Sequence, residues 1–149
     1  GAGQLAKMEE HKKLPHIKTP DPIQDNLDRY RLSAGERHYN LYCGACHQRD
    51  GKGDGNRFPP LEASEWVNDS LEQLIDIVMF GMEGPITVKG LPYNGLMPAN
   101  SHLEDEVIAQ ILTYVKQHFG NNGGTVRESD VRRARQRHLR AQREQQEDI

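Results

Sequence analysis

Two stretches of the chain carry apolar residues at the three- and four-residue spacing of an amphipathic helix. In residues 70–80 the stripe follows a Ser70–Gln73 capping box and stops at Gly81; it contains Leu71, Leu74, Ile75, Val78 and Met79. Residues 104–119 repeat the pattern and stop at Gly120, with Val107, Ile108, Ile111, Leu112 and Val115 on the stripe. Each stretch is therefore predicted to be a helix that buries one face.

A third helix is expected to begin at Ser33. Ser33 and Glu36 form a capping box, in which the hydroxyl and the carboxylate satisfy each other's exposed backbone N–H groups, and the helix runs toward Tyr42. Residues 84–100, GPITVKGLPYNGLMPAN, are different because they are rich in glycine and proline and have no helical period. We expect a long loop there and few strands in the chain, which makes the fold class all-α.

The two ends of the chain lack a clear apolar period. Residues 1–32 contain Pro15, Pro20 and Pro22 among charged and scattered apolar residues, which favours an extended arm; residues 1–12 fit disorder equally well. Residues 121–124, Asn-Asn-Gly-Gly, predict a flexible hinge, and the polar residues after it are expected to be helical from about Ser129. The chain is thus divided into an arm (1–32), a domain (33–124) and a helical extension (125–149).

Composition and charge narrow the classes of protein. Hydrophobic residues make up 35% of the 149 residues and aromatic residues 6%, both low for a domain that fills its own core. The formal net charge of −3 is too small to indicate a nucleic-acid or membrane surface. No apolar run is long enough to cross a bilayer.

The C-terminal extension is the basic part of the chain. Residues 127–149 hold seven arginines against five acidic residues. The apolar stripe of this segment is too thin for a stable isolated helix; it consists of Val131, Ala134, Leu139 and Ala141. One interpretation is a solvated helix packed loosely on an acidic body. The other is that the arginines dock an acidic patch on a redox partner, or anionic lipid.

The clearest chemical motif is Y-C-G-A-C-H over residues 42–47. Cys43 and Cys46 are the only cysteines, and His47 follows them directly. A structural zinc site needs four ligands and the sequence has no second cysteine pair, while a thioredoxin-like dithiol would need strands alternating with helices. The pattern fits covalent attachment of haem c best, with both thiols bound to the porphyrin and the imidazole on the iron. Zinc and a redox dithiol are the alternatives.

An iron held by one histidine needs a sixth ligand or an open site, and the sequence offers four methionines. Met79 belongs to an apolar stripe and is expected in the core, and Met8 lies in the arm. Met82 and Met97 flank the long loop, where a side chain can be aimed at the haem without straining a helix. Met97 is preferred because Pro98 fixes the backbone directly after it, and Met82 is the alternative.

The order of these features resembles a class I monohaem cytochrome c. The likeness rests on YCGACH, on FPPLEASEW at residues 58–66 and on the stretch 84–124, and covers about residues 33–124. The last stretch is especially similar to haem c domains attached to some copper nitrite reductases and sugar or alcohol dehydrogenases. The resemblance implies three main helices around a covalently bound haem, with Gly35 and Tyr39 on the first helix crossing Ile111 and Tyr114 on the last. The arm and the extension lie outside the minimal fold of that family.

The resemblance also implies roles for residues around the haem. A carbonyl in Pro59-Pro60 is expected to accept the ring proton of His47. Trp66 is expected to bond a haem propionate, with plain core packing as the alternative for this side chain. Tyr93 is counted among the cofactor-binding residues.

We therefore expect a one-electron carrier and not an enzyme. One haem c, with its iron held by His47 and Met97, would pass electrons between respiratory or dehydrogenase partners, from a donor to a terminal oxidase or reductase. One alternative is an electron-transfer subunit bound permanently in a larger redox enzyme. A haem gas sensor or a peroxidase-like enzyme is a less favoured alternative.

The expected location follows from the chemistry of attachment. Haem c is attached outside the bacterial cytoplasmic membrane, so we expect an exported protein in the periplasm or on the outer face of that membrane. No export signal is visible at the start of the sequence, which we attribute to processing. The expected partners are redox proteins and not nucleic acid. We expect a monomer, with peripheral membrane association left open.

Overall fold

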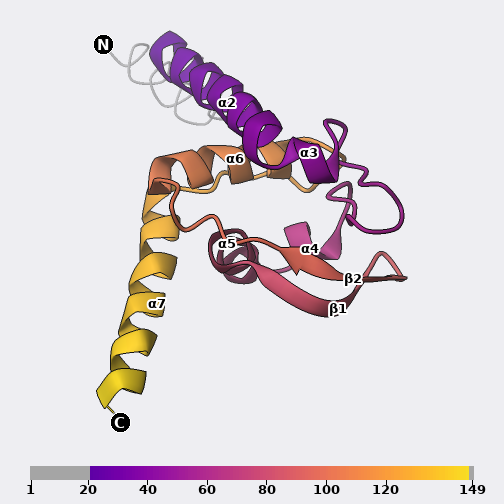
Figure 1. The fold of residues 1–149 in the computed structure, drawn as a ribbon. Helices are drawn as coiled ribbons and strands as arrows, with labels where there is room; N and C mark the ends of the chain where they lie inside the picture. The colour runs from indigo at the N-terminus through magenta and orange to yellow at the C-terminus, as the bar shows by residue number, and fades with distance from the viewer. Residues whose placement is uncertain (1–20, 148–149) are drawn as a thin grey trace, which may run out of the picture.

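The computed structural model describes residues 21–147, so Met8 and most of the expected arm lie outside the described part. Within residues 21–147 the fold is mostly helical, with one two-stranded sheet (Figure 1). In chain order the elements are α2 (Pro22–Tyr42), α3 (Gly44–His47), α4 (Glu65–Asn68), α5 (Leu71–Phe80), β1 (Met82–Val88), β2 (Leu91–Met97), α6 (Asp105–Gln117) and α7 (Glu128–Glu147). None of these helices is long and apolar enough to span a membrane.

Helices α2 and α6 cross at Gly35. A Cβ atom at Gly35 would lie 2.3 Å from the backbone oxygen of Gln110 and 3.0 Å from the Cβ atom of Tyr114. Only glycine lets two backbones approach this closely. One turn further along α2, Tyr39 is fully buried, with its ring centroid 5.5 Å from that of Tyr114. The expected contact between the first and last core helices is therefore present.

The predicted helices at 70–80 and 104–119 are both present as α5 and α6. The hydroxyl of Ser70 accepts the backbone N–H of Gln73 at 3.2 Å, and α5 ends at Gly81, whose φ is 80°. The predicted stripes are buried except at Leu71 and Val107, of which Leu71 is exposed and Val107 partly buried. Together with side chains from α2, α4 and α7 they form one core: Tyr39, Val67, Leu74, Ile75, Val78, Met79, Leu103, Ile108, Ala109, Ile111, Leu112, Tyr114, Val115, Val126, Val131 and Ala134.

Helix α2 begins at Pro22, so the prediction of a helix start at Ser33 is wrong. Asp21 is the N-cap, because its carboxylate accepts the backbone N–H groups of Ile23 (3.0 Å) and Gln24 (3.3 Å), and Pro22 occupies the first turn. Ser33 lies in the middle of this helix. The prediction of an extended arm is therefore also wrong for residues 21–32. All residues from 21 to 31 are exposed, and this half of α2 projects from the domain (Figure 1).

Residues 82–97 form a β-hairpin and not the predicted loop, so the fold is not strictly all-α. Strands β1 and β2 pair antiparallel over their full length, with Met82 opposite Met97. Lys89 and Gly90 make the two-residue turn. Both have positive φ (50° and 79°), as the two central residues of a common type of hairpin turn do. Alternate residues of β1 are the more buried ones, a period of two that the glycines and prolines obscure in the sequence.

The Asn-Asn-Gly-Gly connection after α6, whose composition predicts a flexible hinge, is held by hydrogen bonds to α4 and α6. The amide of Asn68 on α4 donates to Asn121 Oδ1 (3.0 Å) and accepts the backbone N–H of Asn122 (3.0 Å). The N–H of Gly123 donates to the carbonyl of Lys116 at 2.7 Å. Because α4 and α6 both hold this connection, the position of α7 on the domain is defined.

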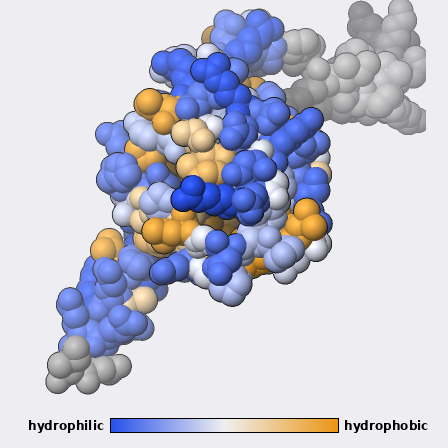
Figure 2. All heavy atoms as spheres, turned by 45° about the vertical axis from the view of Figure 1, so that its right-hand side comes forward, coloured by the Kyte–Doolittle hydropathy of each residue, from blue (hydrophilic) through white to orange (hydrophobic). Residues whose placement is uncertain are grey.

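Helix α7 packs on the domain with its first turns and projects with its last. Val131 and Ala134 are buried in the core, whereas residues 139–147 are exposed. Arg137 pairs with two carboxylates of α5, at 3.2 and 3.6 Å. The projecting end is hydrophilic over most of its surface (Figure 2). These contacts favour a helix packed on an acidic body, and docking of a partner by the remaining arginines stays a prediction.

A side chain at Gly35 should destabilise the crossing of α2 and α6. Gly35→Ala places a methyl group against the Gln110 carbonyl, so the free energy of unfolding should fall by about 3 kcal/mol, as for other overpacked cores. The control is Ser33→Ala, an exposed position on the same helix, which should change stability by less than about 0.5 kcal/mol. Chemical denaturation followed by circular dichroism measures both. Equal midpoints for Gly35→Ala and the parent protein would show that the helices do not meet at this residue.

Candidate functional site

The Cys43–His47 segment is a single helical turn that follows α2. The N–H groups of Cys46 and His47 both donate to the carbonyl of Cys43, at 3.2 and 3.0 Å. Residues three and four positions apart lie on the same side of a helical turn. Cys46 and His47 therefore both lie beside Cys43 on this short turn.

The position of this turn is set by Tyr39. The backbone N–H of Cys43 donates to the backbone carbonyl of Tyr39 (2.8 Å), and the Tyr39 hydroxyl donates to the carbonyl of Gln48 (2.6 Å), so the backbone of this buried residue holds the start of the turn and its side chain holds the end. Burial, reinforced by neighbouring Cys43, raises the pKa of Tyr39 far above its ordinary value, which keeps the hydroxyl a donor. The ring also packs on Phe119, at 5.4 Å between centroids.

His47 is oriented by the expected proline carbonyl. Its Nδ1 lies 2.8 Å from the Pro59 oxygen, and a carbonyl can only accept, so Nδ1 carries the proton. The other ring nitrogen, Nε2, then has a free lone pair, which is the state a metal ligand needs. His47 is 8% exposed, and burial lowers its pKa while the bond to Pro59 acts in the opposite direction. Pro60 is half-buried beside this acceptor.

The glycine-rich loop lets Pro59 reach His47. The N–H of Gly53 donates to the His47 carbonyl at 2.9 Å. A Cβ atom at Gly53 would lie 2.2 Å from the carbonyl oxygen of Phe58, and the φ of Gly53 is 65°. Both the contact and the dihedral angle require glycine here.

Asp54 closes this loop, a role that the sequence interpretation missed. Its carboxylate accepts the backbone N–H groups of Asn56 (3.0 Å), Arg57 (2.8 Å) and Phe58 (2.8 Å). These bonds lower the pKa of Asp54. The signal was present in the sequence, because aspartate followed by Gly-Asn is typical of a turn whose side chain bonds its own backbone.

The alternatives to haem attachment are weaker in the folded chain. Burial, with a smaller contribution from Cys46, raises the pKa of the Cys43 thiol to about 11, whereas redox dithiols have lowered thiol pKa values. Residues 21–147 contain no group of three or more His, Cys, Asp and Glu side chains that could hold a metal ion. Neither cysteine forms a disulfide within the described residues. The set of donors, two thiols with a neutral imidazole of fixed tautomer, fits haem c.

Met97 and Met82 lie opposite each other at the open end of the hairpin. Directly opposed residues of an antiparallel pair share a face of the sheet, so both sulfurs are on the same side. Both side chains are half-buried, and Met97 is among the partly buried residues that pack against the core, as is Cys43. Met79 is fully buried in α5, as predicted for a core residue.

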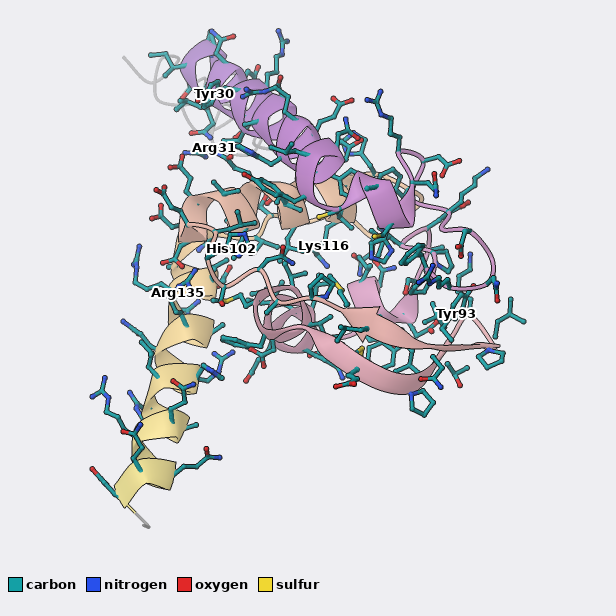
Figure 3. All side chains as sticks on the ribbon, in the orientation of Figure 1. Tyr30, Arg31, Tyr93, His102, Lys116 and Arg135 are labelled. Carbon is teal, nitrogen blue, oxygen red and sulfur yellow. The ribbon has the colours of Figure 1, made fainter. Side chains whose placement is uncertain are left out.

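Two further residues that were expected to contact haem, Tyr93 and Trp66, lie on or against the hairpin. Tyr93 is buried on β2 (Figure 3). The indole N–H of Trp66 donates to the carbonyl of Thr87 at 2.8 Å, and the expected bond to a propionate stays a prediction. Next to it, the carboxylate of Glu65 accepts the N–H of Lys89 (2.8 Å). Helix α4 thus holds the turn of the hairpin, a contact that the sequence interpretation did not contain.

Comparisons with known proteins agree with this geometry. The family model for cytochrome c oxidase, cbb3-type, subunit III matches residues 31–115. Cytochrome c-552 of Thermus thermophilus is 37% identical over 83 residues, which cover 53% of this chain and 63% of that protein.

Two further relatives are subunits of dehydrogenases. The cytochrome c subunit of a quinone alcohol dehydrogenase from Gluconobacter oxydans is 35% identical over 106 residues, or 69% of this chain and 22% of that subunit. The cytochrome subunit of fructose dehydrogenase from Gluconobacter japonicus is 28% identical over 145 residues, or 90% of this chain and 29% of that subunit. The chain therefore spans less than two thirds of the length of each of these relatives.

The role of Asp54 can be tested by pH. Because its folded pKa lies below the ordinary value of 3.8, its contribution to stability is present above that value and is lost as the pH falls through the folded pKa. The unfolding temperature of haem-loaded Asp54→Ala should thus lie below that of the parent at pH 7, and the gap should narrow below about pH 4. Asp54→Asn keeps one acceptor oxygen and should show a smaller gap at pH 7. A gap that stays constant down to pH 3 would contradict the ionised cap.

Proposed function

Because the chain belongs to the cytochrome c family, we propose that it carries single electrons on one covalently bound haem c. The thiols of Cys43 and Cys46 would form the two bonds to the porphyrin, and the imidazole of His47 would hold the iron. A haem iron supplies reversible exchange of one electron between its ferric and ferrous states. The polypeptide supplies the attachment, the axial ligands and the shielding from water.

The observation that carries this proposal is the hydrogen-bonded turn that bears all three donors. A single turn presents Cys43, Cys46 and His47 together, and Tyr39 holds that turn from both ends. The carbonyl of Pro59 fixes the ring proton of His47 on Nδ1, so that Nε2 is the ligand atom. These residues prepare the imidazole before any metal is bound.

In this proposal the sulfur of Met97 would be the second protein ligand of the iron. It packs against the same core as Cys43, at the end of a strand and directly before Pro98, which restricts the backbone. Met82 shares its face of the hairpin and is the alternative sulfur. A thioether favours ferrous iron and raises the reduction potential, which suits an electron carrier.

An iron held by two protein ligands would lack an open coordination position. A sensor or a peroxidase-like enzyme needs an open coordination position for its gas or peroxide. If His47 and Met97 both hold the iron, such a position would be lacking, and the protein would exchange electrons without making or breaking bonds in a substrate. We therefore propose that the chain is not itself an enzyme.

The relatives indicate the class of partner. Two of them are cytochrome subunits of alcohol and fructose dehydrogenases, so we propose a dehydrogenase or another respiratory protein as donor and an oxidase or reductase as acceptor. A permanent subunit of a larger redox complex is the second candidate, because the exposed ends of α2 and α7 project from the domain. Size-exclusion chromatography of native extract, followed at the haem Soret band, separates the two. The periplasm, or the outer face of the cytoplasmic membrane, is the proposed location.

The choice of sulfur ligand can be tested by spectroscopy. Oxidised protein should show the weak far-red charge-transfer band of methionine bound to ferric haem, and Met97→Ala should abolish it. Met82→Ala is the matched control, since Met82 lies opposite Met97, and it should retain the band. Met97→His should keep six-coordinate iron with a lower potential, within the roughly 0.8 V range over which axial ligands tune haems. Loss of the band in Met82→Ala alone would identify Met82 as the ligand.

A further inference from the structure

The segment that leads from Met97 to α6 is held on one side by the end of α5. The N–H of Asn100 donates to the carbonyls of Val78 (3.1 Å) and Met79 (3.0 Å). A Cβ atom at Gly81 would lie 2.6 Å from the backbone oxygen of Met97 itself. The last turn of α5 therefore touches the backbone that carries the proposed ligand.

On its other side the same segment is held by one arginine of α7. The guanidinium of Arg135 donates to the carbonyls of Ser101 (2.6 Å) and Leu103 (2.8 Å) and to the carboxylate of Asp105 (2.8 Å) (Figure 3). The donors of a guanidinium lie in one rigid plane. A single side chain can therefore bind three acceptors in residues 101–105 and hold this segment against α7. The side chains of Arg135 and Asp105 are 29% and 21% exposed, so these bonds are partly shielded from water.

Helix α7 also contacts α5, the helix that supports the other side of the segment after Met97. Arg137 pairs with carboxylates of α5, and the ring of His138 stacks on Phe80 with 3.9 Å between centroids. Phe80 directly precedes Gly81, where α5 touches the backbone of Met97. Both supports of the Met97 segment are therefore in contact with α7.

We infer that Arg135 is a positioning residue for Met97, and that α7 is a brace that keeps this methionine in place as a ligand. The inference rests on the ligation proposed above. Displacing Met97 from the iron requires its segment to move away from the domain. Each bond that holds the segment against the domain therefore opposes this displacement. The brace is a feature of this chain outside the part matched by the family model, which ends at residue 115, whereas α7 begins at Glu128.

Competition with imidazole tests this role. Imidazole added to the oxidised, haem-loaded full chain competes with Met97 for the iron, and loss of the far-red band reports its binding. Arg135→Gln should bind imidazole about tenfold more tightly than the parent, the size expected for losing a hydrogen bond to a charged group. Arg132→Gln is the control, because Arg132 is exposed on the same helix and pairs with Glu128 of its own helix at 3.7 Å; it should match the parent.

A purely structural role for Arg135 predicts a different result. In that case Arg135→Gln would unfold at a lower temperature but bind imidazole with the affinity of the parent, and the inference would be overturned. If Arg135→Gln does not fold, Arg135→Lys gives the same comparison, because it keeps the charge facing Asp105 but lacks the planar set of donors. A far-red band that is absent from the parent protein would mean that the ligation itself is wrong, and the inference would fall with it.

Discussion

The close approach of α2 and α6 at Gly35 is the contact on which the position of the site depends. Only a missing side chain lets the Gln110 carbonyl come so near to α2. This approach brings Tyr39 into the core, where its carbonyl accepts the N–H of Cys43 and its hydroxyl donates to the carbonyl of Gln48, the residue after His47. One packing contact between two helices thus fixes where the thiols and the imidazole face.

The parts of the fold that follow from local spacing could be predicted from the sequence. Helices α5 and α6 have apolar stripes that are buried for most of their length, and the attachment motif needs only five consecutive residues. The start of α2 was missed because its first half is exposed, so no buried stripe distinguishes the Asp21-Pro22 start from the later signal at Ser33. The hairpin was missed because glycines and prolines interrupt its alternation, and Lys89-Gly90 is not one of the Asn-Gly or Asp-Gly pairs that mark a hairpin turn in a sequence.

Contacts between distant residues could not be predicted from periodicity. The bond from Trp66 to Thr87 joins residues 21 positions apart, and the bonds of Arg135 join α7 to residues more than 29 positions earlier. These contacts depend on how the elements pack, which no local pattern encodes. The orientation of His47 by a proline carbonyl was expected only through the resemblance to a family, and the 2.8 Å contact with Pro59 is present.

The proposed function requires one haem attached covalently to the turn that bears Cys43, Cys46 and His47. The most direct test is the mass of the intact protein under denaturing conditions, after production in a host that attaches haem c. One species is expected, heavier than the polypeptide by the mass of one haem. A species with the mass of the polypeptide alone, with haem released on denaturation, would contradict it.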